Sequence, residues 1–197
     1  MTDTPTVEQL ARALAATDEL IVAVDDDQWS NPTPCPDWTV HALVNHLVFG
    51  NQLFGGLMRG EPLPPIDELR QLRTVDRLGG DPIKAYRDSG TALQAAVSEP
   101  GALERACMSP IGPVPGHVLL NLRIAEALVH GWDLAQATGQ PVRLPADVAE
   151  HALAFSRSQF EGDLPRTGRF GAAQPVADDA AAIERLAAYL GRSVPAT

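Results

Sequence analysis

Apolar residues recur along this chain at the spacing of an α-helix, and period-2 runs rich in Val, Ile, Thr and aromatic residues are missing. Four windows carry the helical pattern over roughly 17 to 23 residues each. They extend from Thr6 to the DDDQWS stretch at 25–30, from Thr39 through Met58, from Asp81 to Pro100, and from about Gly116 to Gly139. Four amphipathic helices of this length, joined by polar or Pro-rich connections, predict an all-α protein built as a four-helix bundle.

Residues with known positional preferences mark the ends of these windows. Thr6 and Thr39 stand where a side-chain oxygen can cap a helix, and Pro82 directly after Asp81 is typical of a first helical turn. Gly139 follows the last periodic residue of the fourth window. The Pro-rich stretch at 31–38 and the Pro- and Gly-rich stretch at 60–80 are predicted to be loops.

Two shorter helical patterns follow the fourth window, from Ala146 to Phe160 and from Asp178 to Leu190. The Gly and Pro content of residues 162–180 opposes both helix and strand, which predicts an irregular surface loop. We therefore expect a metal-binding four-helix bundle over residues 1–140, and a C-terminal helical extension over 141–197 that packs on the same domain.

Charge and composition exclude several classes of partner. The chain of 197 residues has 25 acidic and 15 basic side chains, a formal net charge of −10 that repels nucleic acids and anionic membrane surfaces. It shows neither a signal peptide nor the ~20 uninterrupted apolar residues of a membrane span. Its two cysteines form no CxxC pair or disulfide framework. We expect a cytoplasmic protein with reduced thiols and no nucleic-acid or membrane partner.

An acid and a histidine stand four residues apart in the sequence RIAEALVHGWDLAQATG, at 123–139. On a helix, Glu126 and His130 lie about 40° apart and one turn apart, so both can reach one point. His46 falls on the apolar stripe of the second window, facing the bundle interior. Two imidazoles and a carboxylate suit a divalent metal, with zinc first and nickel, iron or copper as alternatives. The competing interpretation is a surface ion pair and an unrelated core histidine.

Three further residues could take part in such a site. Asp133 could accept a hydrogen bond from a metal-binding histidine, or could be a surface acid. Arg123 could meet the carboxylate of an anionic substrate or thiol, or could form an ion pair with Glu126 or Asp133. Cys35 could be a ligand or a redox thiol, although a small buried hydrophobic side chain is the commoner role.

Three stretches together resemble an actinobacterial branch of the DinB-like superfamily, and in particular the metal-binding N-terminal domain of mycothiol-dependent maleylpyruvate isomerase. They are TPCPDWTVHALVNHL at 33–47, AEALVHGWDLAQATG at 125–139 and RFGAAQPVADDAAAIERLAAYLGR at 169–192. The resemblance implies a four-helix bundle in which a second-helix histidine and an E-x3-H pair ligate a divalent metal, usually taken to be zinc. By motif, these ligands are His46, Glu126 and His130.

The resemblance also implies a low-molecular-weight thiol, mycothiol, as cosubstrate. The isomerase has a separate C-terminal domain, whereas this sequence predicts only two helices after residue 140. We therefore expect a metal- and thiol-dependent transferase or isomerase that acts on a small electrophile, rather than maleylpyruvate isomerisation itself. The alternative is a non-catalytic metal- or ligand-binding bundle. The surplus helices after residue 140, together with Trp132 off the metal face, predict a homodimer.

Overall fold

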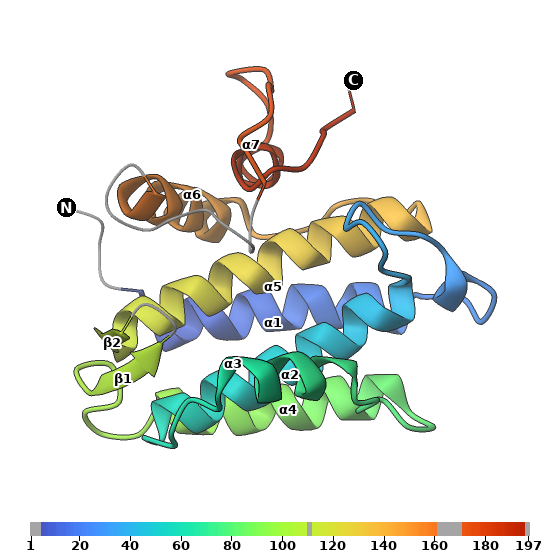
Figure 1. Cartoon of the computed structure of the whole chain (residues 1–197). Coiled ribbons are helices and arrows are strands. Elements are labelled where there is room, and N and C mark those ends of the chain that lie inside the picture. The colour runs from blue at the N-terminus through green and yellow to red at the C-terminus, as the bar shows by residue number, and fades with distance from the viewer. Residues whose placement is uncertain (1–4, 110–111, 161–170, 196–197) are drawn as a thin grey trace.

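Four long helices form the body of the protein. The computed structural model describes residues 5–109, 112–160 and 171–195 (Figure 1). The long helices are α1 (Val7–Val22), α2 (Val40–Met58), α4 (Pro82–Val97) and α5 (Gly116–Thr138). Helix α2 packs against α4, α1 packs against α5, and contacts of α2 with α5 and of α1 with α4 close the bundle. The prediction of an all-α four-helix bundle is confirmed.

The expected capping residues begin three of these helices. The Thr6 side chain accepts a hydrogen bond from Gln9 N, and the Gln9 side chain returns one to the Thr6 backbone, which is a capping box. Thr39 caps α2 by accepting from Ala42 N, and Asp81 caps α4 by accepting from Lys84 N. These caps fix where α2 starts, and therefore which face His46 occupies.

Two shorter helices cover the outer side of α5. Helix α6 (Ala146–Phe160) and helix α7 (Ala182–Tyr189) contact each other and α5 (Figure 1). Helix α7 begins later than the predicted Asp178, because the Glu184 side chain caps the chain at Ala181 by accepting from its backbone N–H. The predicted loop at 162–180 lies partly outside the described residues, and 171–177 have no regular structure.

Three short elements differ from the sequence-based prediction. The stretch at 60–80, predicted to be a loop, contains helix α3 (Ile66–Thr74), which buries Leu69 and has acidic residues in its first turn. Strands β1 (Ala106–Ser109) and β2 (Gly112–Pro115) form an antiparallel hairpin before α5. A 3-10 turn, η1 (Gln28–Ser30), follows α1. All three are too short to give a clear periodic signal.

The hydrophobic core extends from the bundle into the C-terminal helices. Trp132 is 1% exposed and packs inside this core, so it does not present a surface to a second copy. Ile183 and Leu186 of α7 belong to the same core cluster. Both features behind the homodimer prediction are thus accounted for within one chain. None of the helices in the described ranges has the length and apolar character needed to span a bilayer.

Candidate metal centre

A tight turn before α2 places the side chains of Cys35 and Trp38 near the predicted ligands His46 and His130. Trp38 N donates to Cys35 O at 3.2 Å, and Asp37 between them has φ of +67°. Pro36 at the second position and a left-handed third position are typical of a type II turn. Thr33 N donates to Trp38 O at 3.0 Å, and this hydrogen bond joins the two chain segments on either side of the turn. The turn places Trp38 against His46 of α2 and Cys35 against Asp133 of α5.

The imidazoles of His46 and His130 meet between α2 and α5. Their ring centres are 5.1 Å apart with an edge-to-face angle of 82°. The Trp38 indole lies 4.6 Å from His46 and 5.7 Å from His130, centre to centre, and so covers both rings. The sequence gives no local signal for the contact of Trp38 with both histidines, because that contact depends on the turn before α2.

This spacing fits two ligands of one metal ion. Two imidazoles that bind zinc through nitrogen at about 2.1 Å, with tetrahedral angles, hold their ring centres roughly 5 Å apart. Burial lowers the pKa of His46 well below its usual value, helped by the nearby His130 and by Arg123. His46 is therefore neutral at physiological pH, and one of its two ring nitrogens has a lone pair for a metal.

His130 is oriented by a buried carboxylate one turn further along α5. Its Nδ1 lies 2.9 Å from Asp133 Oδ2, and Asp133 is completely buried. An ionised carboxylate can only accept, so Nδ1 carries the proton and Nε2 is left with a lone pair. A histidine that donates to a carboxylate through one nitrogen and ligates through the other is the common arrangement at metal sites.

Asp133 is itself held by an arginine from the C-terminal segment. Arg192 Nε donates to Asp133 Oδ1 at 3.2 Å, and Nη2 donates to Oδ2 at 2.9 Å. Cys35 Sγ donates to the same Oδ2 at 3.2 Å. Burial raises the pKa of Asp133, but the hydrogen bonds from His130 and Arg192 outweigh it and lower that pKa overall. Sequence reasoning assigned no role to Arg192, because nothing in its local pattern indicates a partner 59 residues away.

Among the described residues, one group of three side chains has ligand-type atoms within 4.8 Å of one another, and it consists of Cys35, His130 and Asp133, without His46 or Glu126. By distance alone these three could hold a metal ion. However, Arg192 Nη2 donates to both Cys35 Sγ, at 3.3 Å, and Asp133. A cation among these atoms would displace or repel the guanidinium. The arrangement favours Cys35 and Asp133 as supports for His130 rather than as ligands.

Glu126 is held by Arg123, whose side chain is 1% exposed. Arg123 Nη1 donates to Glu126 Oε2 at 3.1 Å, Nη2 donates to Leu47 O at 3.0 Å, and Nε donates to Asn51 Oδ1 at 3.0 Å. The guanidinium passes close to Gly50, where a Cβ would lie 2.7 Å from Nη1. Because Arg123 is buried and each of its three guanidinium nitrogens already donates to an acceptor, it contacts Glu126 and not an incoming anion. The Glu126 side chain stays 21% exposed.

Comparison with known proteins identifies the family of the chain. Residues 10–135 match the family described as the mycothiol maleylpyruvate isomerase N-terminal domain. The chain belongs to this family. The matched residues contain His46, Glu126 and His130, and the relationship predicted from the sequence motifs is confirmed.

The chain matches nearly the whole length of one relative and about half the length of another. The uncharacterized protein Rv0738 of Mycobacterium tuberculosis is 32% identical over 184 residues, 93% of this chain and 95% of that protein. The uncharacterized protein Rv0036c of the same organism is 24% identical over 140 residues, 62% of this chain and 52% of that protein. The alignment with Rv0738 therefore extends well beyond the matched domain.

Two solved structures share the fold. The crystal structure of the mycothiol-dependent maleylpyruvate isomerase superposes with a TM-score of 0.60 and 19% identity, over 75% of this chain and 66% of that chain. A histidine-to-alanine variant of that isomerase gives a TM-score of 0.60 at 18% identity. This chain thus spans about two thirds of the length of the isomerase.

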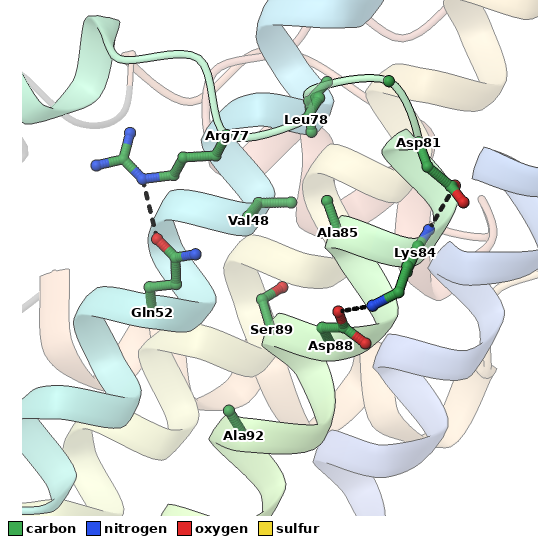
Figure 2. Close-up of a pocket in the computed structure, with 11 residues that line it drawn as sticks. Val48, Gln52, Arg77, Leu78, Asp81, Lys84, Ala85, Asp88, Ser89 and Ala92 are labelled. Carbon is green, nitrogen blue, oxygen red and sulfur yellow. Dashed lines mark hydrogen bonds and ion pairs between the residues drawn. The ribbon is translucent and has the colours of Figure 1, made fainter.

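A hollow of about 520 Å³ between α2 and α4 lies away from the candidate metal centre. Val48 and Gln52, which line it, point about 200° and 240° around α2 from His46. As Figure 2 shows, Arg77 donates to Gln52, and Lys84 pairs with Asp88. The charged side chains of the hollow thus have hydrogen-bond partners within the protein and do not indicate a ligand site.

We expect Cys35 to resist alkylation in the folded protein. Burial and the neighbouring Asp133 carboxylate raise the pKa of its thiol to about 12. At pH 8 only about 1 in 10,000 such thiols is ionised, against roughly a quarter of ordinary exposed cysteines, and the thiolate is the reactive form. Mass spectrometry after iodoacetamide should show modification at least 100-fold slower than in guanidinium-unfolded protein. Equal rates would mean that Cys35 is an accessible thiol of ordinary reactivity and not a buried support for Asp133.

Proposed function

We propose that this protein binds one divalent metal ion, zinc by ligand type with nickel as an alternative, through His46, Glu126 and His130. It uses that ion, with a low-molecular-weight thiol such as mycothiol, in a transfer or isomerisation reaction on a small electrophile. The observation that carries the proposal is the 5.1 Å separation of the two imidazoles, one of which donates through Nδ1 to Asp133. Membership of the mycothiol maleylpyruvate isomerase N-terminal domain family supports the thiol.

Neighbouring side chains hold the three proposed ligands in place before a metal ion binds. Asp133 holds the His130 ring, Arg123 holds one oxygen of Glu126, and Trp38 packs against both imidazoles. Ligands fixed in this way lose little conformational freedom on binding. His46 and Glu126 are both partly exposed, so the centre is reachable from solvent on one side.

The charges around the centre favour an anionic second ligand. Glu126 is paired with Arg123, and Asp133 is paired with Arg192, so the chain's own charges cancel there. A divalent ion bound there supplies an unbalanced positive charge, which favours the thiolate form of an approaching thiol. Three protein ligands are also the number typical of catalytic zinc, where a further position is free for water or substrate.

Calorimetry tests the thiol half of the proposal. Titration of the zinc-loaded protein with mycothiol, in two buffers of different ionisation enthalpy, is expected to show release of about one proton per thiol bound. The metal-free protein and the His46→Ala variant are expected to bind the thiol at least 10-fold more weakly. Conjugation of a model electrophile should follow the same order.

Two outcomes separate this proposal from its alternative. Stoichiometric metal with no thiol binding would leave the non-catalytic metal-binding bundle as the function. Equal thiol affinity of the metal-loaded and metal-free proteins would contradict a role for the metal in thiol activation.

A further inference from the structure

The C-terminal segment reaches the metal centre through one side chain. Arg192 follows α7, which packs on the outside of α5, yet its guanidinium is only 9% exposed. It lies outside residues 10–135, the part of the chain that matches the isomerase N-terminal domain family. A buried arginine from outside that domain therefore contacts the carboxylate that orients His130.

The end of α7 is built to turn Arg192 inward. Arg192 N donates to Ala187 O at 2.9 Å and Gly191 N donates to Ala188 O at 3.0 Å, the paired bonds of a Schellman motif. Gly191 has φ of +96°, a conformation that favours glycine. A Cβ at Gly191 would also lie 2.6 Å from the Cα of Gly171. Both constraints hold the backbone of this turn in one conformation.

Each nitrogen of the Arg192 guanidinium donates to at least one acceptor. Nε and Nη2 donate to the two oxygens of Asp133. Nη2 also donates to Cys35 Sγ, and Nη1 donates to Leu190 O at 3.0 Å. Two parallel bonds to a carboxylate fix its plane as well as its position. Because His130 donates to the same carboxylate, the plane of Asp133 sets the orientation of the imidazole.

We propose that Arg192 is a positioning residue of the metal centre: it locks Asp133, and through Asp133 the His130 imidazole, in the orientation that leaves Nε2 free to ligate. The inference rests on the metal site proposed above. It makes Arg192 part of that site, so the four-helix bundle over residues 1–140 lacks one of the supports of its own ligand.

Metal affinity tests the proposal. The Arg192→Gln variant removes the charge and the paired donors, and is expected to bind zinc 10- to 100-fold more weakly in a chelator competition assay, the usual cost of losing a support of a ligand. Arg192→Lys keeps the charge but not the two parallel bonds, and is expected to fall between wild type and Arg192→Gln.

A second arginine of the same segment supplies the matched control. Arg185, on α7, forms an ion pair with Glu150 on α6, away from the histidines. Arg185→Gln removes an equal charge and should leave zinc affinity within twofold of wild type. Equal affinity of Arg192→Gln and wild type would overturn the proposal.

Nitrogen NMR of the histidine side chains gives a readout that does not need the metal. In wild-type protein, at a pH high enough to keep the ring neutral, His130 should appear as the Nδ1–H tautomer, and Arg192→Gln should give a mixture of tautomers. If wild type binds no zinc, the proposed function fails, and the tautomers alone decide the role of Arg192. A His130 tautomer unchanged in Arg192→Gln would then contradict that role.

Discussion

A variant with both Glu126 and His130 replaced by alanine is expected to purify without metal. Wild-type protein prepared without chelators should contain about one divalent ion per chain, and the double variant less than about a tenth of that, because it keeps one of three ligands. The remaining imidazole of His46 cannot hold an ion against water and buffer alone. Elemental analysis by plasma mass spectrometry gives the metal content and the identity of the metal together.

A third histidine provides the control for this variant. His41 lies on α2, as His46 does, but its side chain is exposed and 3.8 Å from Asp76. His41→Ala should therefore keep the full metal content. Circular dichroism should show that the double variant remains helical, because the hydrophobic core cluster contains neither Glu126 nor His130. Full metal occupancy in the folded double variant would mean that the site has been misplaced.

The fold could be predicted from the sequence where periodicity extends over many residues. Helices α1, α2, α4 and α5 each repeat the apolar pattern over at least four turns, and capping residues such as Thr39 and Asp81 mark their starts. Helix α3 and the hairpin of β1 and β2 have nine and four residues per element, too few to repeat a period. Their formation depends on the bundle surface against which they pack.

Helical spacing also predicts the part of the candidate site that lies on the long helices. His46 and His130 could be placed on facing stripes from helical spacing, and the structure brings their rings to 5.1 Å. The carboxylate of Asp133, three residues from His130 on the same helix, was also within reach of that reasoning. Contacts within one helix, or between facing sides of two helices, can be predicted because the helical period fixes which residues share a face.

Contacts made by loops and chain ends do not follow from such repeats. Trp38 reaches the histidines through a turn in which Asp37 adopts a left-handed backbone, and Arg192 reaches Cys35 across 157 residues of chain. Neither contact has a local signature, because each depends on how α7 and the 31–39 segment dock on α5. Gly191 after the last periodic residue of α7 indicates a helix end, but not where the following side chain lies.

Loss of the Arg123 side chain is expected to cause the largest loss of stability among the substitutions considered. In Arg123→Met, the acceptors on Leu47, Asn51 and Glu126 all lose their donor inside the bundle. Breaking a buried ion pair by removing one partner costs about 3–5 kcal/mol, and the lower end applies because Glu126 is partly exposed. In a chain of this length the melting temperature should fall by on the order of 10 °C.

Thermal and urea denaturation in the presence of a chelator measure this effect without a contribution from bound metal. Arg12→Met is the matched control, because Arg12 forms a two-bond ion pair with Asp147 at the surface, and its loss should leave the midpoint unchanged. In the double variant Arg123→Met with Glu126→Gln no carboxylate is left without its partner, so part of the lost stability should return. A double variant as unstable as the sum of its single substitutions would instead show that Arg123 stabilises the bundle through Leu47 and Asn51, independently of Glu126.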